Sequence, residues 1–282
     1  MPLSPRVEAA MSSQLSENGY AVIEEAIDPE MLERLRDRLD AQAAGEAARG
    51  ETFNEIGQNR RIFNLINKGA VFRDLALHPL ALAAARHVVG NDFLLSSLTA
   101  HIVQSPGLAQ YVHRDQIADF RVPVVVQLLW TLDDFMPENG ATRVIKGSDK
   151  WGPDLAPWSQ EQLERLVEPI AAPAGSAIIF GGLTVHCAGA NNTDRPRRGI
   201  LAYYAKPYYR QSENYALSLS PAVYERASEE LLSLLGFRSH ATFGMVDGPS
   251  DNKGHFLRGS ALTPRPTTWS GPLDAKGRAV EA

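Results

Sequence analysis

The sequence predicts an α+β fold with a mainly antiparallel β core flanked by helices. From about residue 93, short segments rich in β-branched and aromatic residues alternate with clusters of Gly, Pro, Asn and Asp. This pattern is typical of a β-sandwich or barrel. The segments are FLLSSLTAHIV, VPVVVQLLWTLDDF, AGSAIIFGG, TVHCAGA and RGILAYYAKPYY. Capped helical patterns precede and follow them, and no linker divides the chain.

The 282 residues suffice for one large domain, and a single domain in three parts is expected. Residues 1–92 are its mainly helical N-terminal part, residues 93–210 its β core, and residues 211–282 its C-terminal helix and tail. Helices are predicted over residues 28–43, 79–90, 159–166 and 220–236, where capping residues meet apolar stripes. The last of these is expected to be continuous from its Ser-Pro start to its closing glycine.

The composition of the chain bears on whether nucleic acids or membranes are expected partners. Lys and Arg number 28 and Asp and Glu 33, which gives a net charge of −5. We expect no nucleic-acid partner, because such binding needs a concentrated basic patch. The single cysteine suits a reducing compartment. No apolar stretch approaches the ~18 residues of a membrane span, and no signal-peptide run is present at the N-terminus. A cytoplasmic protein without a membrane span is therefore expected.

Three residues predict a metal site. His113 and Asp115 stand two apart in YVHRDQ, and residues two apart in an extended segment point to the same side. His186 follows AGSAIIFGG and is the best candidate for a third ligand. Two imidazoles and a carboxylate suit iron and leave further coordination positions open. We therefore expect His113, Asp115 and His186 to be both the metal ligands and the catalytic centre.

The order of these residues resembles the iron(II)- and 2-oxoglutarate-dependent dioxygenases, and within them the phytanoyl-CoA dioxygenase family. That pattern is H-x-D, a long spacer, a second histidine, and an arginine eleven residues later, which His113, Asp115, His186 and Arg197 fit. Four stretches resemble other blocks of the family: SENGYAVIEEAIDPE, LAQYVHRDQ, ENGATRVIKGSDKW and HCAGANNTDRPRRG. The third has aspartate where the family usually has histidine. The resemblance covers roughly residues 14–210 and implies a double-stranded β-helix, the jelly roll of cupin-like proteins.

The resemblance also implies Fe(II), 2-oxoglutarate as cosubstrate, and O₂. Arg197 would bind the distal carboxylate of 2-oxoglutarate, because the planar guanidinium grips a carboxylate with two charge-assisted bonds. Arg198 is its neighbour, and only one of the two can point inward on a strand. The family spacing favours Arg197, and Arg198 remains the alternative.

Further contacts with the cosubstrate rest on the resemblance alone. Related fungal natural-product oxygenases have a glutamine three residues before the first ligand, here Gln110, and a threonine in the Asn-Gly-Ala-Thr segment, here Thr142. An amide in the central strand fits Gln127, whereas Trp130 matches a tryptophan of the phytanoyl-CoA branch. Residues three apart face opposite sides of a regular strand, so only one of them is expected at the cosubstrate, and Gln127 is favoured.

The retained carboxylate, Asp115, implies hydroxylation, desaturation or a related C–H oxidation, since related halogenases replace it with a small residue. We expect a mostly apolar small-molecule substrate, and Phe53, Phe63 and Ile66 are candidates to face it. The likeness to natural-product enzymes favours secondary metabolism. The tail stretch FGMVDG is a candidate for closing the site or reaching a second copy of the chain, so a homodimer is one expectation.

Three other interpretations stay open at this stage. One is a phytanoyl-CoA-type hydroxylase of an acyl thioester, and another is a non-catalytic jelly-roll binding protein. A damaged ligand set would indicate the second, and every expected ligand is present. The third is a cupin-like metalloenzyme that does not use 2-oxoglutarate, for which Arg197 would be dispensable.

Overall fold

The computed structural model describes residues 3–54, 59–116, 120–152, 155–240, 243–244 and 271–281. Its α-helices are α1 (Pro5–Asn18), α2 (Pro29–Ala48), α3 (Ala70–Ala76), α4 (Pro79–Val89), α5 (Gln160–Glu164), α6 (Tyr215–Ser218), α7 (Pro221–Arg226) and α8 (Glu229–Leu234). Its strands are β1 (Tyr20–Ile23), β2 (Phe53–Asn54), β3 (Arg60–Ile62), β4 (Leu94–Val103), β5 (Val125–Thr131), β6 (Thr142–Val144), β7 (Glu168–Pro169), β8 (Ala177–Gly181), β9 (His186–Ala188) and β10 (Arg197–Ala205). Two 3-10 turns are η1 (Leu65–Asn67) and η2 (Ser148–Lys150).

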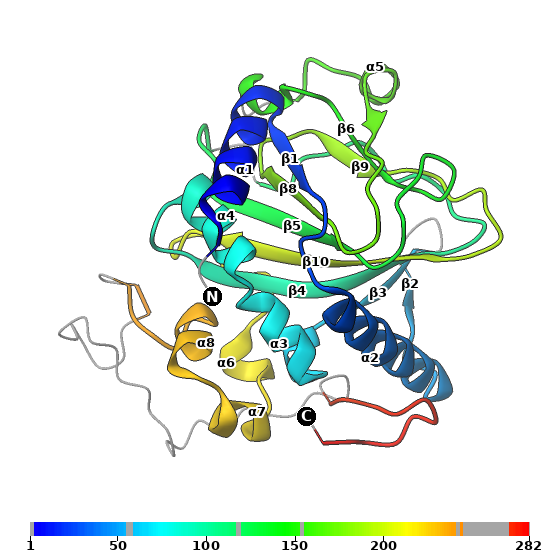
Figure 1. Cartoon of the computed structure of the whole chain (residues 1–282), viewed down its shortest axis with the longest axis vertical. Coiled ribbons are helices and arrows are strands. Elements are labelled where there is room, and N and C mark those ends of the chain that lie inside the picture. The colour runs from blue at the N-terminus through cyan, green and yellow to red at the C-terminus, as the bar shows by residue number, and fades with distance from the viewer. Residues whose placement is uncertain are drawn as a thin grey trace.

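Two antiparallel sheets form the core (Figure 1). The larger sheet has the strand order β1-β8-β5-β10-β4-β3-β2, and the smaller has the order β7-β6-β9. Strands that are distant in the sequence are neighbours, since β10 lies between β5 and β4 and β1 pairs with β8. This is the mainly β, helix-flanked arrangement that the sequence predicts.

The two faces of the larger sheet differ in chemistry. Alternate residues such as Leu128, Trp130 and Ala202 are buried against helices, and Figure 1 shows α1, α4 and α3 along one side of this sheet. Their neighbours, such as Gln127 and Arg197, line a cavity on the other face. Because successive side chains of a strand point to opposite faces, the same strands supply the core and the cavity wall.

A β-bulge in β4 determines which of its side chains face the helices and which face the cavity. The register between β4 and β10 shifts so that Tyr203 pairs with Ser97 while Tyr204 pairs with Leu95. One extra residue on β4 therefore changes which side chains face which way. Leu95 joins the core under the helices, whereas Ser97 and Thr99 line the cavity.

The N-terminal part contributes strands as well as helices. β1 pairs with β8, and β3 pairs with β4, so this part extends both edges of the larger sheet. The predicted helix after Asp28 is α2, and the Asp28 carboxylate accepts from the Met31 N–H at 2.7 Å, as an N-cap does. α2 continues to Ala48, beyond the expected end near residue 43.

The prediction of one continuous helix over residues 220–236 is wrong, because this segment forms two helices, α7 and α8. Ala227 between them is extended, with φ −66° and ψ 143°. Ser228 then begins α8, and its hydroxyl accepts from the Leu231 N–H at 3.1 Å. A serine followed by two glutamates is a helix start in its own right. The irregular tail expected after residue 238 lies largely outside the described residues.

The described C-terminal residues 271–281 lie against α2. The Leu273 N–H donates to Gln42 Oε1 at 2.9 Å, and Arg38 donates to the Leu273 carbonyl at 2.7 Å. Gly45 permits this approach, because a Cβ there would lie 2.7 Å from the Cβ of Leu273. The beginning and the end of the described chain are thus joined at this helix.

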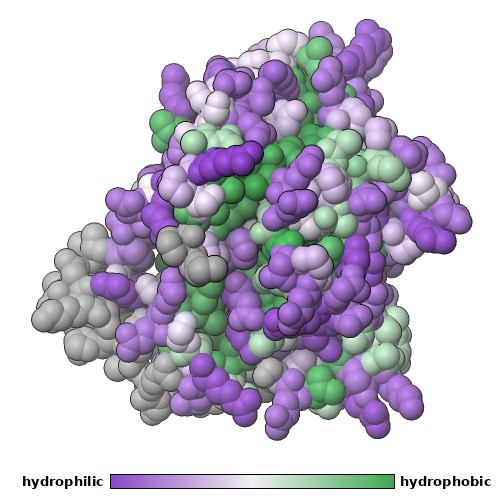
Figure 2. Space-filling view, in the orientation of Figure 1, coloured by the Kyte–Doolittle hydropathy of each residue, from purple (hydrophilic) through white to green (hydrophobic). Residues whose placement is uncertain are grey.

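The surface seen in Figure 2 is mostly hydrophilic, with hydrophobic residues gathered in a strip toward the middle of this face. Among the described residues, no helix is both long enough and apolar enough to cross a membrane.

Candidate metal centre

The two histidines predicted as ligands lie side by side although they are far apart in the sequence. His186 is the first residue of β9, and His113 pairs with it in an isolated backbone bridge. Each donates its backbone N–H to the carbonyl oxygen of the other, at 2.9 and 3.0 Å. Residues 111–115 do not form the regular extended segment that the sequence suggested, and this bridge takes its place in positioning His113.

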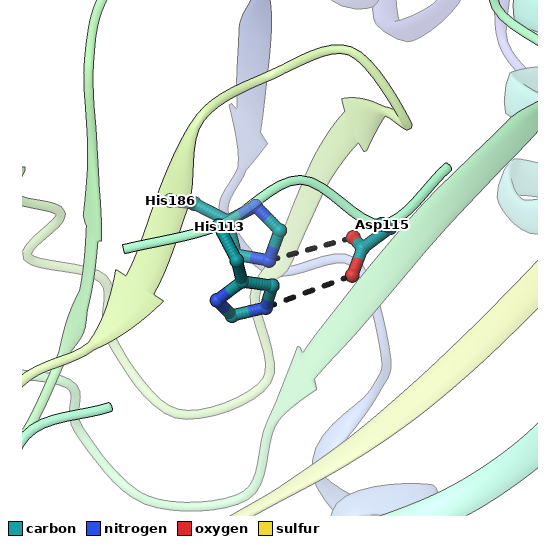
Figure 3. A group of neighbouring side chains, drawn as sticks. All are labelled: His113, Asp115 and His186. Atoms are coloured by element: carbon teal, nitrogen blue, oxygen red, sulfur yellow. Dashed lines mark ion pairs between the residues drawn. The ribbon is translucent and has the colours of Figure 1, made fainter. Parts of the chain in front are cut away.

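His113, Asp115 and His186 converge on one point (Figure 3). His113 Nε2 lies 3.8 Å from Asp115 Oδ1, and His186 Nε2 lies 3.4 Å from Asp115 Oδ2. One donor atom from each residue lies within 4.8 Å of the others. Two imidazole nitrogens and a carboxylate oxygen at this spacing form a group able to hold one metal ion with other coordination positions open.

Backbone carbonyls orient both imidazole rings. His113 Nδ1 lies 2.7 Å from the Tyr111 carbonyl oxygen, and His186 Nδ1 lies 3.0 Å from that of Thr184. A carbonyl oxygen only accepts, so each Nδ1 carries the proton and each Nε2 keeps its lone pair. Burial lowers the pKa of His186. This imidazole is therefore neutral at pH 7 and able to bind a cation.

Other side chains fix the loop that carries Asp115. The Tyr203 hydroxyl donates to the Asp115 carbonyl oxygen at 3.0 Å. The next residue, Gln116, accepts from the Val124 N–H and donates to the Val122 carbonyl, both at 3.1 Å. The carboxylate is thus presented by a loop that is held by a hydrogen bond to the Asp115 carbonyl and by the side chain of Gln116.

A cavity of about 350 Å³ opens beside the three residues. It lies between the two sheets, and side chains of β4, β5, β6, β8 and β10 line it. The polar ones include Ser97, Thr99, His101, Gln127, Thr142 and Arg197. A concave space with a few convergent polar groups is the usual form of a small-molecule site.

Arg197 places a buried cation in this cavity. Its side chain is only 2% exposed, and Nη2 donates to the Gly140 carbonyl at 2.5 Å. The guanidinium lies 4.0 Å from the centre of the Phe135 ring, a cation–π contact. Burial lowers the pKa of Arg197 to about 9, so it stays charged at neutral pH. Among the described residues, its Nε has no hydrogen-bond partner.

Gly199 makes room for the ring beneath Arg197. A Cβ at this position would lie 3.2 Å from Phe135 Cζ and 3.0 Å from Leu129 Cδ1. These distances are shorter than ordinary van der Waals contact. Phe135 can therefore reach Arg197 because position 199 on the same strand has no side chain.

Arg198 points to the opposite face, where its guanidinium forms ion pairs with two carboxylates. Its Nη2 lies 2.6 Å from Asp133 Oδ1, and its Nη1 lies 2.6 Å from Asp40 Oδ2. Hydrogen bonds with Asp133, and then with Asp40, raise the pKa of Arg198. The structure thus separates the two adjacent arginines as strand alternation predicts, with Arg197 inside and Arg198 outside.

The other residues predicted at the cosubstrate, Gln110, Gln127 and Thr142, also line the cavity. The Gln110 Oε1 accepts from the Ala188 N–H at 3.1 Å. The Gln127 Oε1 is buried and has no hydrogen-bond partner in the described part of the chain. Trp130 faces the helices instead and is fully buried, with its ring 5.0 Å from that of His78. Gln127, and not Trp130, is therefore the residue that faces the cavity.

Sequence reasoning did not assign His101 or Arg61 to the cavity. Arg61 Nη1 is hydrogen-bonded to His101 Nε2, and a guanidinium only donates, so this nitrogen accepts. His101 lies two residues after Thr99 on β4, so strand alternation puts both on one face. The sequence does not show which face lines the cavity. Phe63 lines the cavity as expected, whereas Ile66 is fully buried in the core and does not face a substrate.

A converged His-Asp-His group beside a buried arginine, between two sheets of a jelly roll, defines a metal-dependent oxygenase as the class of this protein. The family model described as "Phytanoyl-CoA dioxygenase (PhyH)" matches residues 15–199, about two thirds of the 282 residues. The chain belongs to the phytanoyl-CoA dioxygenase family, which confirms the resemblance seen in its motifs.

Curated fungal relatives agree with this assignment. Dioxygenase af480 of Aspergillus fumigatus is 34% identical over 239 residues, which cover 79% of this chain and 75% of that protein. Dioxygenase trt7 of Aspergillus terreus is 31% identical over 214 residues, which cover 70% of this chain and 72% of that protein. The similarity extends over most of each chain, and the protein is a dioxygenase.

Solved structures share the fold. HygX from Streptomyces hygroscopicus, with nickel and 2-oxoglutarate bound, has a TM-score of 0.61 and 18% identity and covers 74% of this chain and 89% of its own. The epimerase SnoN, in complex with Fe3+, alpha ketoglutarate and nogalamycin RO, has a TM-score of 0.59 and 21% identity and covers 74% and 88%. These likenesses confirm the predicted jelly roll.

Proposed function

We propose that the chain is a non-haem Fe(II)- and 2-oxoglutarate-dependent oxygenase that oxidises a C–H bond of a mostly apolar small molecule in secondary metabolism. One observation carries the proposal: a single cavity holds both the converged group of His113, Asp115 and His186 and the buried cation of Arg197. The first suits iron. The second suits the far carboxylate of a keto acid.

The residues present fit both groups. His113, Asp115 and His186 would hold Fe(II) through two Nε2 atoms and one carboxylate. Arg197 is a buried cation whose Nε lacks a partner among the described residues, and buried polar atoms of this kind are normally satisfied. Gln127 adds a second buried polar side chain in the same state. A dicarboxylate ligand would accept from the Arg197 Nε–H, whereas the Gln127 Oε1 needs a donor, such as a substrate hydroxyl.

The residues of the chain would bind and orient the metal and the cosubstrate. When bound, iron(II) with 2-oxoglutarate and O₂ supplies the oxidation of substrate, with release of succinate and CO₂. The carbonyls of Tyr111 and Thr184 hold the imidazole protons at Nδ1, so both rings keep their Nε2 atoms aimed at the site. Arg197 would fix the cosubstrate by its carboxylate.

The relatives of known structure support a natural product as substrate. HygX was solved with hygromycin B and SnoN with nogalamycin RO. The competing proposal is hydroxylation of an acyl thioester, which the description of the family suggests. A non-catalytic binding protein is disfavoured by an intact ligand group with both rings oriented. The single-domain organisation, a cytoplasmic location, the lack of a nucleic-acid partner and a homodimer stay predictions.

Succinate formation tests the proposal directly. Protein loaded with Fe(II) is incubated with 2-oxoglutarate and O₂, with and without small-molecule extracts. We expect succinate that depends on Fe(II) and is lost in His186→Ala. Substrates are identified in the extracts as compounds that gain one oxygen or lose two hydrogens. A folded protein that binds neither Fe(II) nor 2-oxoglutarate by calorimetry would contradict the proposal.

A further inference from the structure

A second cavity adjoins the cavity of the metal centre, and we infer that it binds the apolar body of the substrate. Its volume is about 310 Å³. Arg61, Phe63 and Glu213 line both cavities, so the two spaces share one wall. The inference rests on the proposed function, because the reacting end of the substrate must lie at the metal centre. We call the space beside the metal centre the inner cavity and the other the outer cavity.

The wall of the outer cavity is largely apolar although charged residues line it. Lys68 Nζ lies 2.6 Å from Glu46 Oε1, and both side chains are almost fully buried. This pairing turns the two charges toward each other and leaves the alkyl parts of the side chains toward the space. The ring of Phe53 meets that of Phe63 edge to face, with centroids 5.2 Å apart.

The two aromatic rings are unusually exposed for their type. Phe53 is 47% and Phe63 43% exposed, whereas phenylalanine is among the residues most often buried. Phe53 lies on β2, and Phe63 directly follows β3, so both belong to the hairpin at the edge of the larger sheet. A ligand in the outer cavity would cover these rings and remove apolar surface from water. They are therefore the residues that select its apolar part.

The shape of the two cavities specifies the kind of molecule. The inner cavity, of about 350 Å³, must also hold 2-oxoglutarate, so a larger substrate has to extend past its outer wall. At that wall Arg61 and Glu213 place one charge of each sign. The substrate that fits is an elongated amphipathic molecule. Its polar groups lie near Arg61 and Glu213, and its apolar body lies against Phe53 and Phe63.

Binding of 1-anilinonaphthalene-8-sulfonate, an aromatic molecule with one charged group, tests the outer cavity. It is titrated without O₂ into protein loaded with Fe(II) and 2-oxoglutarate, and its fluorescence is followed. We expect the double variant Phe53→Ala/Phe63→Ala to bind it about tenfold more weakly, which is about 1.4 kcal/mol. The control Leu217→Ala removes a side chain that is 60% exposed and lines neither cavity, and should bind it as the wild type does.

Alkylation then locates the bound probe. The one native cysteine, Cys187, is buried, so a maleimide reports on an introduced thiol. We expect the probe to protect Phe53→Cys but not Leu217→Cys. An unchanged affinity of the double variant, or an unprotected thiol in Phe53→Cys, would overturn the inference.

Formation of succinate from 2-oxoglutarate without substrate separates this inference from the proposed function. It is measured on the wild type and on the control Leu217→Ala, which lines neither cavity and should keep the wild-type rate. If the wild type forms no succinate, the proposed function fails, whatever the probe shows. If the wild type forms succinate and the double variant binds the probe with unchanged affinity, only the inference about the outer cavity is refuted.

Discussion

The two faces of the larger sheet use the same strands for opposite purposes. On the face toward the helices, Trp130 and its neighbours are fully buried and apolar. On the face toward the cavity, Gln127 and Arg197 are equally buried but polar, and each has an atom without a partner in the described part of the chain. Burial without satisfaction costs stability unless a ligand supplies the missing partner. The difference teaches that one face is built for folding and the other for binding.

The sharpest way to break this comparison is to remove the carboxylate at the metal centre. Asp115→Ala should abolish turnover, a larger effect than the ~10–100-fold losses typical of groups that only support a metal ligand. Fe(II) binding is measured by calorimetry and turnover by succinate. Asp194→Ala removes an exposed carboxylate and serves as the control. Iron binding that survives Asp115→Ala unchanged would refute the assigned ligand.

Trp130 and Gln127 test the two faces on a single strand. Trp130→Ala should lower the free energy of unfolding by ~3–5 kcal/mol, because it leaves a large cavity in the core. Its KM for 2-oxoglutarate should stay near the wild-type value. Gln127→Leu should raise the KM for 2-oxoglutarate and change the free energy of unfolding little. Denaturant unfolding and succinate kinetics measure the two quantities, and equal effects of both variants on KM would contradict the division.

The adjacent arginines test the same idea on β10. Arg197→Gln should raise the KM for 2-oxoglutarate by ~10–100-fold, since a hydrogen bond to a charged group contributes about 1.5–3 kcal/mol. Arg198→Gln should leave KM unchanged and lower stability by no more than ~1 kcal/mol, as its ion pairs are partly exposed to solvent. The opposite outcome would make Arg198 the residue that binds the carboxylate.

Phe135 gives the smallest expected effect. Phe135→Leu keeps an apolar side chain beneath Arg197 but removes the aromatic face. A cation–π contact contributes ~0.5–2 kcal/mol, so we expect a severalfold rise in KM for 2-oxoglutarate. An unchanged KM in Phe135→Leu would show that the ring does not support the guanidinium.

Local rules predicted much of the fold and the cavity. Alternation along strands separated Arg197 from Arg198 and Gln127 from Trp130, and the resemblance to the family favoured Arg197 and Gln127 as the inward residue of each pair. Capping rules also found the start of α2 at Asp28. These features depend on neighbours in the sequence, so the sequence alone can show them.

Features that depend on distant contacts were not predictable. The bridge between His113 and His186 replaced the expected extended segment. The break before Ser228 is different, because its capping signal is local and was overlooked. The role of Phe135 depends on the missing side chain at Gly199, which only the packing of two elements reveals. His101 gave no signal beyond its strand, because its partner Arg61 lies on a different one.

The contacts between α2 and Leu273 have a consequence for the order of synthesis. The Leu273 N–H donates to the Oε1 of Gln42, and the guanidinium of Arg38 donates to the Leu273 carbonyl, so both side chains bind a residue translated more than two hundred positions later. Until that residue leaves the ribosome, α2 carries polar groups that the finished protein buries and pairs. Gln42 also donates to Glu46 Oε1 at 3.1 Å, and Glu46 pairs with Lys68 beside the outer cavity. A residue translated near the end of the chain is thus connected to that wall through Gln42.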